Sequence, residues 1–79
     1  MIKLNILNMK KFLQTVNDCS SPVNLIDADG RRENINKNFL FQREMMNQHI
    51  KNGKYSRLVL EIAKPKDYMN IIFYYIGDC

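Results

Sequence analysis

The chain has 79 residues, 46% hydrophobic and 25% charged, and its 12 Lys and Arg against 8 Asp and Glu give a formal net charge of +4. This length and near-average composition exclude a two-domain, collagen-like or disordered protein and predict a single domain over residues 1–79. The longest apolar run, Ile71–Ile76, is far shorter than the roughly 20 residues of a membrane-spanning helix, so no membrane partner is expected. Because the first residues lack the apolar centre of a signal peptide, we expect a cytoplasmic protein.

The first third of the chain predicts a strand and then a helix. Ile2, Leu4 and Ile6 alternate with polar residues, which is typical of a strand with one buried face. Asn8 then offers an N-cap side chain for a helix that ends near Cys19. The apolar residues of this helix share one face at i, i+3, i+4 and i+7: Met9, Phe12, Leu13 and Val16.

A hairpin is predicted next. Pro22 ends the first helix, and Val23 and Leu25 begin a second strand. The dipeptide Asp29-Gly30 separates it from a third strand at residues 31–35, and this dipeptide favours a tight turn because glycine tolerates a positive φ. The second and third strands are therefore expected to be antiparallel neighbours.

A second helix is predicted from Lys37 to Lys51, with Phe39, Met46 and Ile50 close together on one face. Its remaining apolar residues point elsewhere: Leu40, Phe41 and Met45. The next glycine, at position 53, is a favourable C-cap, and alternation over residues 58–62 predicts a fourth strand.

Pro65 suits the first turn of a third helix, which Gly77 ends. Its apolar residues recur at helical spacing: Tyr68, Ile71, Ile72 and Tyr75. A strand over residues 71–76 is the competing interpretation, because β-branched and aromatic residues are frequent there. The order βαββαβα predicts an α+β fold, a two-layer open-faced sandwich whose four-stranded antiparallel sheet carries all helices on one face. RNA-recognition and ferredoxin-like domains share a βαββαβ core, so this order alone does not choose a function.

Three stretches resemble HPr, the histidine-containing phosphocarrier of the bacterial sugar phosphotransferase system: Phe12–Asn17, Val23–Asp27 and Asp29–Ile35. The Met-rich second helix, the fourth strand and the long last helix follow in the order of that family. The resemblance covers most of residues 2–76 and implies a single HPr-like domain.

The resemblance also implies that phosphoryl transfer has been lost. HPr proteins carry the phosphoryl group on a histidine at the start of the first helix, where backbone N–H groups and the helix dipole hold it. The alignment places Asn5 at this position, and an asparagine cannot carry phosphate. Lys37 aligns with the family's regulatory serine. We therefore expect no catalytic residue and no enzymatic activity.

His49 is the only histidine, and it suits either a shifted phosphoacceptor or pH switch, or a partly exposed helix residue without a task. Cys19 and Cys79 belong to no metal or redox motif and are expected to be free thiols. Three acidic residues near the hairpin lack the downstream glutamate of a calcium loop, so neither a metal ion nor a cofactor is expected: Asp27, Asp29 and Glu33.

In HPr proteins the second helix and the mouth of the first helix form the docking surface for partner proteins. One inward stripe cannot bury every apolar residue of the second helix here, so we expect some of them to bind a protein partner: Phe39, Leu40, Phe41, Met45 and Met46. Lys10, Lys11 and Lys51 are expected to form a basic rim that steers an acidic partner. Core packing, or a homodimer contact through Leu40 or Phe41, is the alternative for the same residues.

The sequence thus predicts a non-catalytic HPr-like protein-binding or regulatory module. The alternative is a small basic nucleic-acid-binding accessory protein, because basic and aromatic residues gather near one end: Lys51, Lys54, Tyr55 and Arg57. Residues 2–6 and 31–35 contain none of the aromatic residues on which an RNA-recognition motif stacks bases, which disfavours this alternative.

Overall fold

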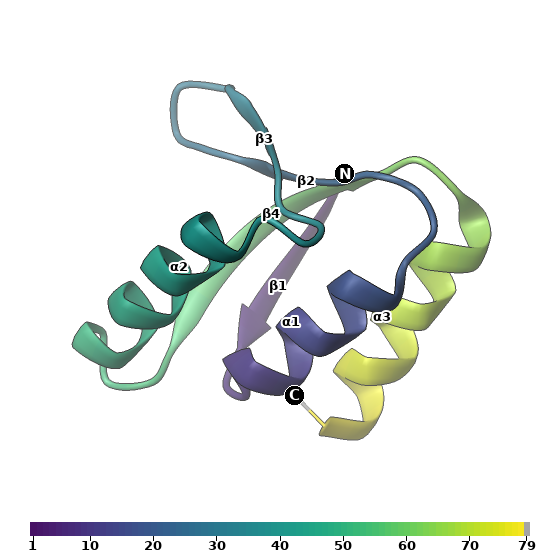
Figure 1. Cartoon of the computed structure of the whole chain (residues 1–79). Coiled ribbons are helices and arrows are strands. Elements are labelled where there is room, and N and C mark those ends of the chain that lie inside the picture. The colour runs from purple at the N-terminus through teal and green to yellow at the C-terminus, as the bar shows by residue number, and fades with distance from the viewer. Residues whose placement is uncertain (79) are drawn as a thin grey trace.

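One antiparallel sheet carries three helices in the computed structural model, which describes residues 1–78 (Figure 1). The strand order is β1-β4-β2-β3, and every pair of neighbours is antiparallel. The elements are β1 (Ile2–Ile6), α1 (Met9–Asp18), β2 (Val23–Ile26), β3 (Arg32–Asn34), α2 (Phe39–Lys51), β4 (Ser56–Ile62) and α3 (Pro65–Asp78). The predicted α+β open-faced sandwich is confirmed, and the last apolar segment is a helix that runs one residue past Gly77, not a strand.

The two faces of the sheet differ because side chains alternate along each strand. On one face of the sheet, Leu4 of β1 lies opposite Leu58 of β4, and Leu25 of β2 lies opposite Leu60 of β4. These apolar side chains face the helices and belong to the core or pack against it. The other face carries mainly polar side chains, and no helix covers it: Lys3, Asn5, Asn24, Arg57 and Glu61.

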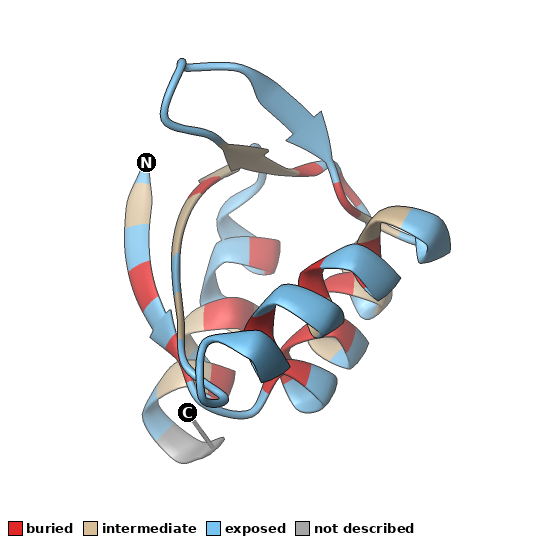
Figure 2. Cartoon of the chain, turned by 90° about the vertical axis from the view of Figure 1, so that its left-hand side faces the viewer, coloured by how far each residue is buried: buried red, intermediate tan, exposed pale blue. Residues whose placement is uncertain are grey.

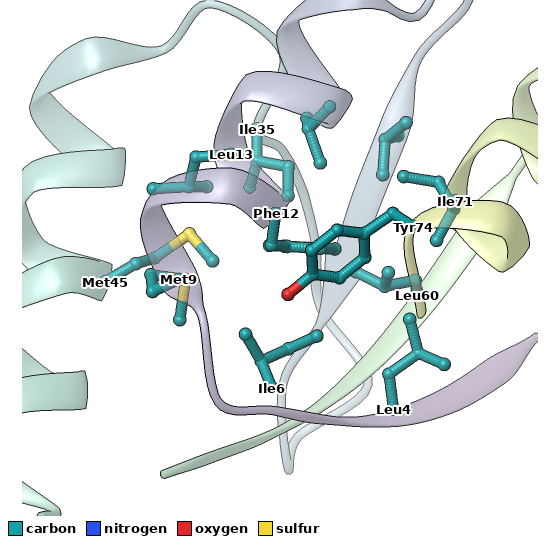
Figure 3. Packing of buried hydrophobic residues seen from close by; sticks show 12 residues of the cluster. Leu4, Ile6, Met9, Phe12, Leu13, Ile35, Met45, Leu60, Ile71 and Tyr74 are labelled. Atoms are coloured by element: carbon teal, nitrogen blue, oxygen red, sulfur yellow. The ribbon is translucent and has the colours of Figure 1, made fainter. Parts of the chain in front are cut away.

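The prediction for the first helix is confirmed in its cap and its inward face. Asn8 Oδ1 accepts the backbone N–H of Lys11 at 3.1 Å, and the four predicted inward residues are buried. Phe12 is fully buried, and its ring lies 5.8 Å from that of Tyr74 on α3 (Figure 3). Figure 2 shows the same pattern on the helices, with buried segments turned inward and exposed segments outward.

The hairpin between β2 and β3 is also confirmed. The Asp27 carboxylate accepts the backbone N–H groups of Asp29 and Arg31, both at 2.9 Å. Gly30 has φ +83°, a conformation that glycine adopts without strain. Asp27 therefore acts as a cap of this turn.

Helix α2 ends in a Schellman motif. The Lys54 N–H donates to the carbonyl of His49 at 2.8 Å, and the Gly53 N–H donates to that of Ile50 at 3.1 Å. Gly53 has the left-handed φ, +73°, that this motif requires. The C-cap predicted at this glycine is thus confirmed.

The inward face of α2 is not the one that the apolar spacing indicates. Its buried residues are Gln42, Met45 and His49, whereas Phe39 and Ile50 are exposed. Polar side chains can face inward here because they find partners there. Gln42 Nε2 donates to the Ile35 carbonyl and to Asn17 Oδ1, both at 2.7 Å.

Asp67 joins the start of α3 to the loop after α1. It is 1% exposed, and its carboxylate accepts the backbone N–H of Ser20 at 3.2 Å and that of Ser21 at 2.8 Å, together with the Ser21 hydroxyl. The buried face of α3 consequently runs through Asp67, Ile71 and Tyr74. Tyr68, predicted to point inward, is exposed, because Asp67 takes the inward position of that turn.

These contacts make stability depend on pH. The hydrogen bond from the Ser21 hydroxyl, followed by the two backbone N–H groups, holds the pKa of Asp67 below its usual value. A lowered folded-state pKa stabilises the fold above the unfolded-state value, near 3.9, and this contribution is lost as the pH falls through the folded-state pKa. We therefore expect Asp67→Asn to lower the urea midpoint clearly at neutral pH and much less in acid below that range.

Urea unfolding followed by circular dichroism at about pH 7 and at a series of decreasing pH values below about 3.9 measures both differences. Asp18→Asn, at an exposed position, is the control and should change neither midpoint. If Asp67→Asn lowered the urea midpoint by the same amount at neutral and at acid pH, the ionised Asp67 carboxylate would not be the source of the stabilisation.

Candidate docking surface

The turn between β1 and α1 forms a surface hollow together with the second half of α2. Leu7 precedes the helix cap and is exposed. The hollow has a volume of about 310 Å³ and is bordered by residues of both helices and of the turns beside them: Leu7, Asn8, Met9, Lys10, Met46, His49, Ile50 and Lys54. The structure thus places the mouth of α1 next to α2.

His49 joins three segments at this place. It is 3% exposed, and its Nε2 donates to the Leu7 carbonyl at 3.0 Å, because a carbonyl can only accept. In the neutral ring Nδ1 then accepts the Ser56 hydroxyl at 2.7 Å. The expectation of a partly exposed residue without a task is wrong, since His49 ties α2 to the mouth of α1 and to the start of β4. A phosphoacceptor role would require one of these hydrogen bonds to break.

Asn5, the aligned position of the lost phosphoacceptor, lies inside β1 on the open face of the sheet. Its Oδ1 accepts Arg57 Nε at 3.4 Å. The residue at the mouth of α1 is Asn8, three positions later. Lys37, aligned with the regulatory serine, has a positive φ of 54° in the turn before α2. The side chains of Asn5 and Asn8 both lack a group that can carry phosphate.

The five apolar residues expected to bind a partner divide into three groups. Phe39 and Leu40 are 67% and 78% exposed at the start of α2. Phe41 and Met46 are half-buried and pack against the core. Met45 is a core residue and not part of a surface, because it lies on the helix face that carries Gln42 and His49.

Two residues of this surface were not predicted from the sequence. Ile50 is as exposed as Leu7, and it continues a line along α2 through Phe39 and Met46 at i, i+7 and i+11. The spacing grouped these three residues, but they form an outer flank of the helix and not its core face. Leu7 gave no signal because a single apolar residue between a strand and a helix belongs to neither period.

The basic rim also differs from the expectation. Lys10 borders the hollow, and its companion there is Lys54 from the turn after α2. Lys11 and Lys51 are exposed on the same two helices. The positive charge at the hollow therefore comes from residues 44 positions apart, Lys10 and Lys54, which no local charge pattern reveals.

A second groove lies on the other side of α2, between this helix and the sheet. Its volume is about 330 Å³, and five apolar and five polar residues border it: Met9, Leu25, Phe41, Met45 and Leu58, with Glu44, Gln48, Asn52, Ser56 and Arg57. Methionine side chains adapt their shape readily, and Met9 borders both hollows. Helix α2 thus stands between two adaptable depressions.

Cys19 is a free, half-buried thiol whose Sγ donates to the Thr15 carbonyl at 3.4 Å. Burial, and then the negative charges of Asp67 and Asp18, raise its pKa to about 11. Such a thiol is a poor nucleophile at neutral pH. Cys79 lies outside the described residues.

Comparisons with protein-family models, with curated proteins and with solved structures gave no match for this chain. Among residues 1–78, no helix has the length and apolar character that crossing a membrane requires.

Proposed function

We propose that this chain is a non-catalytic, HPr-like protein-binding module of the cytoplasm that has lost phosphoryl transfer and docks a protein partner over α2 and the mouth of α1. The observation that carries this proposal is a group of large apolar side chains that this side of the molecule leaves exposed: Leu7, Phe39, Leu40 and Ile50. An apolar patch of this kind, with polar residues around it, is typical of an interaction site.

The surroundings of these residues support a protein partner. The hollow beside Ile50 offers a depression for a side chain of the partner, and Met46 at its border can adapt to different shapes. Lys10 and Lys54 add positive charge at its edge. Charges at the rim of an interface mainly accelerate association, so an acidic partner would be captured faster at low salt.

The loss of phosphoryl transfer is supported by the residues that stand at the mouth of α1, three positions after the aligned Asn5. Asn8 at the mouth of α1 uses its side-chain oxygen to cap the helix. His49, the only histidine, lies close to this place, but both of its ring nitrogens are engaged. Binding without group transfer is the function that this arrangement supports best.

The proposal predicts which surface captures the partner. Phe39→Ser/Ile50→Ser removes two exposed apolar groups without touching the core, and we expect it to weaken partner binding at least tenfold, as the loss of an interface hot spot does. Phe73→Ser on α3 is the matched control, because Phe73 is 64% exposed and Phe39 is 67% exposed. The measurement is capture from lysate with each immobilised protein, followed by titration calorimetry with the identified partner.

A protein held by the wild type and by Phe73→Ser, but not by the double variant, is the expected result. Equal retention of the protein by all three would contradict docking over α2. Nucleic acid captured by all three and released by salt would replace the proposal with the nucleic-acid-binding alternative, since only phosphate contacts give that steep salt dependence.

A further inference from the structure

The outer face of α3 is apolar along its described length. Its buried side consists of Asp67, Ile71 and Tyr74, and the opposite side carries the exposed apolar side chains, with Ile72 half-buried beside them. The exposed group is Tyr68, Met69, Phe73 and Ile76. Lys66, in the first turn, is the one charged residue of α3 outside its buried face up to Ile76. This patch is separate from the surface over α2, because α1 lies between the two helices (Figure 1).

The two edges of the sheet differ in how they are protected. Strand β3, at one edge, has three residues that are all polar and exposed, which discourages pairing with another strand. Strand β1, at the other edge, has five residues with alternating apolar side chains and one charge, that of Lys3. In the part of the chain that the structure describes, β1 pairs with β4 alone. This edge is therefore open to a further strand.

The open edge and the apolar helix face lie at the same end of the molecule. Helix α3 is the helix farthest from α2, and Leu4 of β1 lies on the α3 side of the core, below Ile71 and Tyr74 (Figure 3). A molecule that covers both the edge of β1 and the outer face of α3 has to supply a strand edge and an apolar helix face. A second copy of the chain supplies both.

We propose that the chain forms a two-fold dimer in which β1 pairs antiparallel with β1 of a second copy and the two α3 helices pack against each other. A two-fold axis perpendicular to the sheet at Leu4 keeps both sets of helices on the same side. It also places Lys3 opposite Asn5 of the second copy, so the lysines do not face each other.

The spacing along α3 fits the same axis. Met69 and Ile76 lie four residues before and three residues after Phe73, so in an antiparallel helix pair Met69 meets Ile76 of the second copy. Phe73 then lies near Phe73 of the second copy. The stripe is thus complementary to itself, as an interface with two-fold symmetry requires.

The size of the interface predicts a weak dimer. A large apolar side chain has an area of about 200 Å², so four that are roughly half exposed offer on the order of 400 Å² per copy. With the strand pairing, the dimer buries on the order of 1,000 Å² in total, at the lower limit for a specific interface. We expect a dissociation constant in the micromolar range. A lipid surface is the weaker match, because helices that lie on membranes carry several basic residues and α3 exposes one.

The test is sedimentation velocity of the intact chain from micromolar to millimolar concentration. The wild type should shift from 9.4 kDa toward twice that mass. Phe73→Glu should remain monomeric because two carboxylates meet near the axis, and Phe39→Glu, equally exposed on α2, should dimerise like the wild type. Circular dichroism is used to check that both variants are folded. An equal mixture of Phe73→Glu and Phe73→Lys should regain the dimer, which a folding defect would not allow.

Amide hydrogen exchange tests the strand contact. Protection should increase with concentration in β1 and not in β3, and unchanged protection in β1 would overturn edge-to-edge pairing. A wild type that remains monomeric at millimolar concentration would overturn the dimer, and co-sedimentation of this monomer with anionic lipid vesicles would assign the α3 face to a membrane surface instead. Dimerisation lost in Phe39→Glu but not in Phe73→Glu would move the interface to α2. Sedimentation of the two variants does not depend on capture of a partner. The dimer proposal can therefore be wrong while the docking function is right, and the reverse.

Discussion

Replacing Phe12 by alanine should remove about 3–5 kcal/mol from the stability of this domain. Phe12 is fully buried between the sheet and α3, where its ring packs against Tyr74. Loss of a buried phenylalanine side chain costs about 3–5 kcal/mol through lost transfer free energy and the cavity left behind. A domain of 79 residues has roughly 4–12 kcal/mol in total, so this single substitution should remove at least about a quarter of its stability.

Urea unfolding followed by circular dichroism measures this loss. Leu40→Ala is the control, because Leu40 is 78% exposed and its truncation should change the free energy of unfolding by less than about 0.5 kcal/mol. A loss below about 1 kcal/mol in Phe12→Ala would show that the core does not centre on this ring.

His49→Ala is the second large expected effect, at about 2–3 kcal/mol of lost stability. The substitution removes a buried side chain and leaves the part-buried Leu7 carbonyl and Ser56 hydroxyl without their hydrogen-bond partner. It also releases the mouth of α1 from α2, so we expect the variant to bind the partner of the docking surface more weakly even where it is folded.

The same unfolding experiment and partner titration test both effects. His49→Gln retains an amide donor for the Leu7 carbonyl and should recover part of the stability, whereas Gln48→Ala, at the exposed neighbouring position, should be neutral. If His49→Gln were no more stable than His49→Ala, the hydrogen bond to Leu7 would not be the source of the effect.

The elements that the sequence predicted well are those whose signals are local. Asn8 as a cap, the spacing of Met9, Phe12, Leu13 and Val16, and the turn at Gly30 all lie within a few residues of the structure that they specify. The type of each element depends on such neighbours, so the order of helices and strands was predictable. The pairing of β1 with β4 depends on residues 50 to 58 positions apart.

The buried face of α2, and part of that of α3, differ from the face that the apolar spacing indicates, and the reason is common to both helices. Gln42, His49 and Asp67 are polar residues that each have a partner in a distant segment: Asn17 for Gln42, Leu7 for His49 and Ser21 for Asp67. An analysis of apolar spacing assigns such residues to the solvent side and rotates the helix accordingly. The exposure of Phe39 and the burial of Met45 follow from the same rotation.

Strand β1 has a consequence for how the protein forms in the cell. In the described residues 1–78 its one neighbour in the sheet is β4, so Ile6 meets Ser56 only after fifty further residues have been synthesised. At about 5–20 residues per second, the ribosome leaves the first strand without a neighbour for seconds. Helix α1 meets Tyr74 later still. The domain therefore cannot fold progressively from its N-terminus, and it is the emergence of its last third that triggers folding.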